Sequence, residues 1–108
     1  MLRVYVVIAT VMFAAPAVAK GEMNATWYQS GKRTANGEKF DPNGMTAAHR
    51  TYPFGTMMRV SHKGKSVIVR INDRGPFRKG YQLDLARGAA FSIGCHGLCK
   101  VNYEIVQR

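Results

Sequence analysis

The sequence predicts a small, mainly β domain that closes, or nearly closes, into a barrel and carries one short helix. Three observations support this class. Short segments of alternating apolar and polar residues recur along the chain, and clusters of turn-forming residues separate them. Only one segment, residues 85–93, has apolar residues spaced four apart as in a helix. Several short strands with turn signals between them are typical of small barrels.

The first half of the chain predicts one strand followed by a long loop. Residues 20–23 read as a short leader, and residues 24–29 (NATWYQ) alternate well enough to begin a strand. Residues 30–44 are dense in turn formers, and a long irregular segment in so small a domain indicates a functional loop. Residues 45–51 (MTAAHRT) fit either a short strand or a helical turn, and residues 53–55 turn the chain.

The middle of the chain predicts a β-hairpin and then the helix. Residues 56–62 and 66–72 both read as strands, and Lys63-Gly64-Lys65 forms the turn between them. Asp84 is in a position to cap a helix over residues 85–93, whose apolar residues line one face.

The C-terminal region predicts a last strand over residues 100–107, in which Val101, Tyr103 and Ile105 alternate with polar residues. The two cysteines, Cys95 and Cys99, precede it. In an oxidising compartment such a pair forms a disulfide, which here closes a very short loop. The alternative is a metal held by Cys95, His96 and Cys99, but no fourth ligand is near, so no metal site is predicted.

The N-terminus, residues 1–19, has the features of a cleaved secretory signal peptide. Arg3 supplies the positive charge, residues 4–15 are apolar, and residues 17–19 (AVA) form a cleavage site. The apolar region is shorter than the ~20 residues that a spanning helix needs. We therefore expect a mature domain over residues 20–108, exported to the periplasm or secreted. No cysteine lies near the cut, so no lipid anchor is expected.

The charge balance indicates an anionic partner. The chain has 16 basic and 6 acidic residues, and removing Arg3 leaves 15 basic against 6 acidic. In an exported protein this charge favours cell-wall polymers over nucleic acid, although it also fits a role in solubility alone. No cofactor is predicted.

Several long motifs carry a family resemblance: TANGE-x-F-D, TAAHRT-x-PFG and VRINDRGPF, followed by the D-L segment at residues 84–85. With them the chain resembles the RlpA-like (rare lipoprotein A) family from about residue 25 to residue 106. The resemblance implies a six-stranded double-psi β-barrel and a peptidoglycan lytic transglycosylase, a carbon–oxygen lyase acting on polysaccharides. Such an enzyme cleaves the β-1,4 bond between N-acetylmuramic acid (MurNAc) and N-acetylglucosamine (GlcNAc), leaving 1,6-anhydro-MurNAc ends.

The sequence departs from the fuller family pattern in three ways. It has no lipobox cysteine, no sporulation-related repeat domain, and it carries the unassigned GCHGLC insert at residues 94–99. We therefore expect a monomer without a stable membrane anchor, acting on peptidoglycan glycan strands.

A lytic transglycosylase needs one group that protonates the leaving oxygen and then accepts a proton from the substrate's own 6-hydroxyl. Asp73 has the best local argument, because it ends a strand and is followed by Gly75-Pro76. The resemblance also places it at the catalytic aspartate. Arg70 and Arg74 favour its ionised form, which suits electrostatic support better than proton donation. The alternative is that Asp73 pairs with Arg74 or caps the turn.

The resemblance implies two further catalytic residues, Glu38 and His49. Taken alone, Glu38 is equally a solvated loop acid, and His49 a structural hydrogen-bond donor. We predict substrate-binding roles for four residues, of which Asp41 also fits an Asx-turn. They are Tyr28, Asp41, Arg50 and Arg74.

Two other classes of function remain open at this point. One is a non-catalytic, expansin-like module that binds wall glycan. The other is a secreted effector or defence-type protein in which charge and disulfide serve surface binding and stability. The presence together of Glu38, His49 and Asp73 favours the enzyme.

Overall fold

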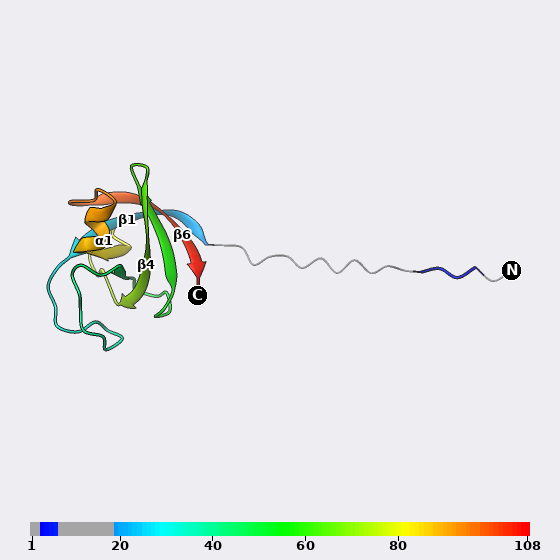
Figure 1. Ribbon diagram of the computed structural model, residues 1–108, viewed down its shortest axis with the longest axis horizontal. Coiled ribbons are helices and arrows are strands. Elements are labelled where there is room, and N and C mark those ends of the chain that lie inside the picture. Colours follow the sequence, from blue (N-terminus) through cyan, green and yellow to red (C-terminus); the bar gives the residue numbers. More distant parts are fainter. Residues whose placement is uncertain (1–2, 7–18) are drawn as a thin grey trace.

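Six strands close into a barrel, and one short helix packs against it (Figure 1). The computed structural model describes residues 3–6 and 19–108, so the predicted signal peptide lies largely outside the described residues. The elements in chain order are β1 (Lys20–Tyr28), β2 (Thr46–Ala48), β3 (Met57–His62), β4 (Lys65–Asp73), β5 (Leu83–Ala86), α1 (Arg87–Ser92) and β6 (Cys99–Gln107). Within this described part, no helix has the length and apolarity needed to cross a membrane.

The order of strands around the barrel is β1-β5-β2-β4-β3-β6. The β1/β5 and β2/β4 pairs are parallel, and the other pairs are antiparallel. Strand β5 is thus inserted between β1 and β2, although it follows both in the chain. The predicted fold class, a closed six-stranded barrel with one short helix, is confirmed.

The core fills the inside of the barrel with apolar side chains from alternate strand positions, which is the pattern expected of strands with one buried face. Eight such residues from four strands are at most 6% exposed: Met58, Val60, Val69, Ile71, Leu83, Leu85, Val101 and Ile105. Alternation in the sequence therefore predicted the hairpin β3–β4 and the last strand β6 correctly. The segment over residues 45–51, which fitted either a short strand or a helical turn, contains a strand, β2, at Thr46–Ala48.

The predicted leader over residues 20–23 is wrong, because these residues form the first part of β1. They pair with β6 in a continuous antiparallel register from Lys20 opposite Glu104 to Met23 opposite Val101. Met23 is only 7% exposed and belongs to the core. Burial of this side chain and the ladder of backbone hydrogen bonds extend the strand beyond its alternating segment.

The prediction that Asp84 caps a helix is also wrong. Asp84 lies inside β5, and the helix begins at Arg87, with Ala86 at the N-cap and no side-chain cap. Leu83 and Leu85 are both fully buried, so the chain needs the two-residue period of a strand here. The four-residue spacing from Leu85 onward matched a helix only because the helix follows at once.

The predicted disulfide is present. Cys95 and Cys99 are bonded, with their Cα atoms 6.0 Å apart, and they join the end of α1 to the start of β6. Cys95 is fully buried in the core cluster, whereas Leu98 within the closed loop is exposed.

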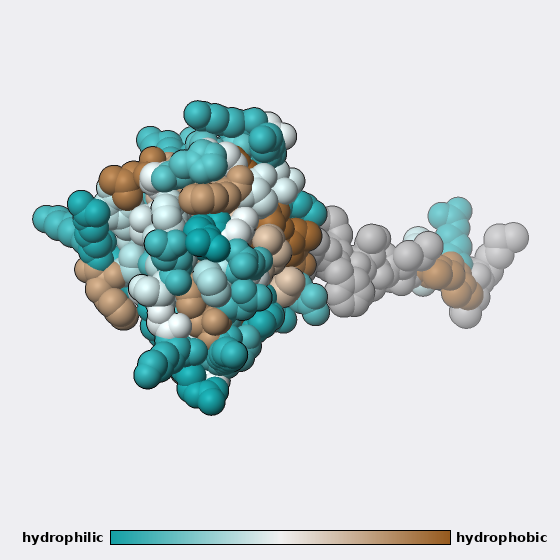
Figure 2. All heavy atoms as spheres, turned by 60° about the vertical axis from the view of Figure 1, so that its left-hand side comes forward, coloured by the Kyte–Doolittle hydropathy of each residue, from teal (hydrophilic) through white to brown (hydrophobic). Residues whose placement is uncertain are grey.

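The predicted irregular segment is the long loop (residues 29–45) between β1 and β2, which is confirmed. A bridge between Arg33 and Lys39 folds its middle back on itself. Figure 1 shows this loop, in cyan to green, on the same side of the barrel as α1. Figure 2 turns that side forward and shows a largely hydrophilic surface with small, separate apolar patches.

Candidate functional site

The predicted catalytic Asp73 ends β4 at the side of the barrel that carries the long loop, and both of its carboxylate oxygens accept hydrogen bonds. Oδ1 accepts from the backbone N–H groups of Ala35, at 2.8 Å, and of Arg74, at 2.9 Å. Oδ2 accepts from the hydroxyl of Tyr28 at 3.0 Å. The carboxylate is therefore held by a loop, a turn and a neighbouring strand, which fixes its position.

Tyr28 ends β1, and its side chain connects the long loop to the strand end. Its ring stacks on Phe40 with centroids 4.6 Å apart, while its hydroxyl donates to Asp73. Burial is the main cause that raises the pKa of Tyr28 above its usual value, and the charge of Asp73 and the hydrogen bond to it act in the same direction. Tyr28 therefore remains a protonated donor at physiological pH.

The two arginines that flank Asp73 in the sequence bond to other groups. Arg74 donates from Nη1 to the carbonyls of His49, at 3.2 Å, and Tyr52, at 2.8 Å, and its guanidinium lies 3.9 Å from the centroid of the Phe54 ring. Arg70 forms an ion pair with Glu38. The anticipated side-chain pair of Asp73 with Arg74 is not found, since only the backbone of Arg74 contacts the carboxylate.

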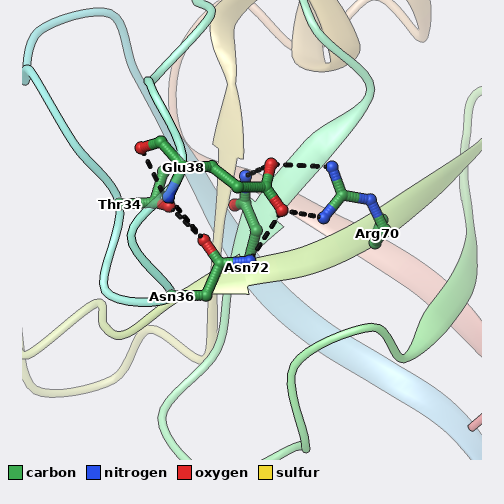
Figure 3. A network of polar contacts seen from close by, with 5 residues as sticks. All are labelled: Thr34, Asn36, Glu38, Arg70 and Asn72. Atoms are coloured by element: carbon green, nitrogen blue, oxygen red, sulfur yellow. Dashed lines mark hydrogen bonds and ion pairs between the residues drawn. The ribbon is translucent and has the colours of Figure 1, made fainter.

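Glu38 reaches from the long loop to the side chain of Arg70 on β4 (Figure 3). Its carboxylate binds the guanidinium through both oxygens, with Nη2 and Oε2 2.8 Å apart, and accepts from Asn36 at 2.6 Å and Asn72 at 3.4 Å. These bonds, with Arg70 first and Asn36 second, lower the pKa of Glu38 to about 2. At neutral pH Glu38 carries no proton to donate.

His49 follows β2 and lies beside the end of β4, where its backbone N–H donates to the carbonyl of Asp73 at 3.2 Å. Its ring stacks on Tyr52, and Nδ1 accepts from the backbone N–H groups of Thr51 and Tyr52. Because Nδ1 is an acceptor, the neutral ring carries its proton on Nε2. Burial first, and then the charges of Arg50 and Arg74, lower the pKa of His49. The ring is therefore a neutral Nε2–H donor.

Two other predicted substrate-binding residues, Asp41 and Arg50, differ in how strongly their side chains are hydrogen-bonded to the protein. Asp41 accepts from the backbone N–H of Asn43 at 2.9 Å, which is the Asx-turn alternative. Arg50 is exposed, and its guanidinium has one long hydrogen bond, 3.5 Å, to the carbonyl of Pro76. Of the two arginines predicted to bind substrate, Arg50 therefore has fewer hydrogen bonds to the protein than Arg74.

Sequence reasoning assigned Asp84 to a helix cap and did not include it in the site. Its Oδ1 is buried and has no hydrogen-bond partner among the residues that the structure describes. Burial first, and the charge of Asp73 second, raise the pKa of Asp84 to about 6. The available signal was an acid between two leucines, Leu83 and Leu85. Both leucines are buried, and strand alternation therefore turns Asp84 away from the core.

Among residues 3–6 and 19–108, no group of three histidine, cysteine, aspartate or glutamate side chains is placed to hold a metal ion. The side chains described above are the carboxylates of Asp73, Glu38 and Asp84, the hydroxyl of Tyr28, the neutral ring of His49, and the guanidinium groups of Arg70 and Arg74.

Comparison with known proteins identifies the domain. The family model described as lytic transglycolase matches residues 20–104. The "Probable endolytic peptidoglycan transglycosylase RlpA" of Synechocystis sp. is 54% identical over 90 residues, which is 77% of this chain and 28% of the relative. The "Endolytic peptidoglycan transglycosylase RlpA" of Pseudomonas aeruginosa is 51% identical over 75 residues, 65% of this chain and 22% of the relative. The protein of the same name from Neisseria meningitidis serogroup A is 46% identical over 76 residues, which is 66% of this chain and 32% of the relative.

The chain thus spans 22–32% of the length of these three relatives. Among solved structures, the Streptomyces papain inhibitor superposes with a TM-score of 0.71 over 87% of this chain and 100% of its own, at 20% identity. At that identity the likeness supports the barrel fold alone. The family model and the three relatives all match the barrel domain, and the chain therefore belongs to the lytic transglycolase family, as an RlpA-like double-psi β-barrel.

Proposed function

We propose that the barrel is an exported endolytic peptidoglycan lytic transglycosylase, which cleaves the MurNAc-β-1,4-GlcNAc bond and leaves 1,6-anhydro-MurNAc ends. The observation that carries the proposal is the Asp73 carboxylate, fixed by Tyr28 and by the backbone of the long loop, next to the neutral His49. The relatives named as endolytic peptidoglycan transglycosylases, 46–54% identical over the same domain, support it.

The reaction consumes no water. The bond between C1 of MurNAc and O4 of GlcNAc breaks, and the 6-hydroxyl of the same MurNAc closes on C1. We assign to Asp73 the electrostatic support of the positive charge that develops at C1, because a carboxylate acts there without gaining a proton. His49 offers its Nε2–H to a substrate oxygen, which fits a donor that stays neutral.

Glu38 is a positioning residue in this proposal. Its ion pair with Arg70 anchors the long loop to β4, and the adjacent Asn36 N–H donates to the carbonyl of Asn72 at 3.2 Å. The same stretch of loop presents the Ala35 N–H to Asp73. Loss of the Glu38 carboxylate would therefore disturb the catalytic aspartate through the loop.

Substrate binding is assigned to exposed groups near the site. We assign to Arg50 the binding of a peptide carboxylate of the wall, a role that its exposure supports, whereas Arg74 orders the turn that carries His49. Phe54 is 42% exposed and Phe77 is 81% exposed, and their rings suit packing against the apolar face of a pyranose. The excess of basic residues favours the anionic wall, in the periplasm or outside the cell.

The test is digestion of intact and of peptide-free peptidoglycan with the purified protein, followed by mass spectrometry of the soluble products. We expect 1,6-anhydro-muramyl ends. Binding to the glycan without such products would instead support a non-catalytic, expansin-like module. Asp73→Asn, Glu38→Gln and His49→Ala should each reduce product formation strongly. Glu22→Gln, a charge removal at an exposed pair with Lys100, should leave it unchanged.

A further inference from the structure

The proposed reaction needs a group that can give up and regain a proton near neutral pH, and Glu38, Asp73 and His49 do not supply one. Glu38 is ionised and bound to Arg70. Both oxygens of Asp73 are already acceptors for donors of the protein. His49 is a neutral donor whose other nitrogen is occupied by backbone N–H groups, so it cannot release and regain a proton readily.

Strand register places a second aspartate on the same face as Asp73. Ala48 on β2 is paired with Asp73 on one side and with Asp84 on the other. Residues that are paired across a sheet project to the same face. Asp73 and Asp84 are thus separated by two strand spacings, about 10 Å between Cα atoms, with Ala48 on the strand between them.

This face is the one turned away from the barrel core. Leu83 and Leu85 point into the core and are fully buried, so Asp84 between them points outward. The hydrogen bond from Tyr28 on β1 to Asp73 on β4 spans β5 and β2, the strands that carry Asp84 and Ala48. Asp84 therefore lies within the constellation already described.

Asp84 also differs from Asp73 in its hydrogen bonding. Its Oδ1 is shielded from solvent and no group of the described residues donates to it. An unpaired buried carboxylate is costly, and a carboxylic acid avoids this cost by keeping its proton. Two carboxyl groups with such different surroundings are a recognised way to divide an acid role from an ionised role.

We propose that Asp84 is the proton-transferring residue of the site. As the C1–O4 bond breaks, its carboxyl gives a proton to O4. As the 6-hydroxyl oxygen bonds to C1, the resulting carboxylate takes the hydroxyl proton and is restored. One bond forms, one breaks, and the proton on Asp84 is regenerated. The inference rests on the proposed lytic transglycosylase activity and divides the work between an acid, Asp84, and an ionised partner, Asp73.

The surroundings of Asp84 support this division. The titratable groups shown to interact with it are Asp73 on β4 and Tyr28 on β1. Tyr28 is uncharged, so burial first and the charge of Asp73 second account for the raised pKa of Asp84, about 6. The nearest basic residue along the chain, Arg87, directs its guanidinium to Gln29 and Asn43.

The decisive experiment compares Asp84→Asn with wild type on peptide-free glycan, scoring anhydro ends by mass spectrometry. We expect kcat to fall about 10²–10⁴-fold, the contribution typical of a positioned general acid, while glycan binding is retained. The matched control, Glu104→Gln, removes an acid that is 46% exposed and paired with Arg59, and should keep wild-type kcat.

The second measurement is NMR titration of the Asp84 carboxyl in the folded wild type. We expect a midpoint near pH 6, and a lower midpoint in Asp73→Asn because one of the two causes is removed. The kcat of wild type should fall with rising pH through the same midpoint. This readout stands even if Asp84→Asn fails to fold.

The outcomes separate the two proposals. Wild-type anhydro products with undiminished turnover by folded Asp84→Asn would overturn the role of Asp84 and leave the proposed function intact. A titration midpoint near pH 4 would overturn it equally, since the acid would then hold no proton at neutral pH. Glycan binding by wild type without anhydro products would refute the enzyme, and the inference with it.

Discussion

The ionisation of Asp84 should make the stability of the barrel depend on pH in a direction that can be computed in advance. The folded state raises the pKa of this carboxyl from 3.8 to about 6, so folding takes up a proton between these values. The stabilisation is complete below pH 4 and is lost as the pH rises through 6. Replacing Asp84 with asparagine keeps the shape and removes the titration.

The magnitude follows from the size of the shift. Each unit of pKa displacement corresponds to about 1.4 kcal/mol, so this group alone sets an upper bound of about 3 kcal/mol on the unfolding free energy that wild type loses between pH 4 and pH 7.5, and solvent screening of the partly exposed side chain lowers it. Asp84→Asn should lack that loss and be the more stable protein at pH 7.5. Active sites commonly contain a group that is needed for function and that lowers the stability of the fold.

The assay is urea denaturation of wild type and Asp84→Asn at both pH values. The difference between the two proteins should change by up to about 3 kcal/mol from pH 4 to pH 7.5. Titrations shared by both proteins, such as those of Glu38 and His49, cancel in this comparison. Glu104→Gln should show no such change, because its carboxylate is exposed. An equal loss of stability in wild type and Asp84→Asn would refute the reasoning.

Three further predictions follow from other contacts. Glu38→Gln should cost about 1 kcal/mol or less, because the pair with Arg70 is 38% exposed and screened, yet it should accelerate hydrogen exchange of the Ala35 and Asn36 amides, whose acceptors lie on β4. Gly88→Ala should cost about 1–3 kcal/mol in urea denaturation, because the new Cβ would lie 2.8 Å from the backbone of Asn43, whereas Gly97→Ala meets no atom within 4 Å and should be neutral. His49 should titrate below pH 6.5 by NMR and lose its Nε2–H tautomer only there; a midpoint at or above 6.5 would contradict the burial argument.

Much of the fold could be predicted because its signals are local. The hairpin of β3 and β4 follows from alternation on both sides of Lys63-Gly64, and β6 from the alternation of Val101, Tyr103 and Ile105. The short strand β5 could not be separated from the helix that follows, because four residues fit both periods. Its identity depends on neighbours: β1 and β2 provide hydrogen bonds on both sides.

The candidate site divides in a similar way. The family resemblance predicted site roles for Asp73, Glu38, His49 and Tyr28, and the structure places the first three on one loop and at two strand ends. The partners of the arginines could not be predicted. Arg74 adjoins Asp73 in the chain but bonds to the carbonyls of His49 and Tyr52. Proximity in sequence is a poor guide where a turn directs a side chain away.

By itself, the sequence determined the alternation that fills a barrel, the basic charge, the disulfide and the family to which the chain belongs. Only the tertiary structure decided which carboxyl has a raised pKa. The strand order β5-β2-β4 brings Asp84 opposite Ala48 and Ala48 opposite Asp73, residues far apart along the chain. Desolvation and the field of a neighbouring charge depend on what surrounds a group in space, so they arise only when the barrel closes.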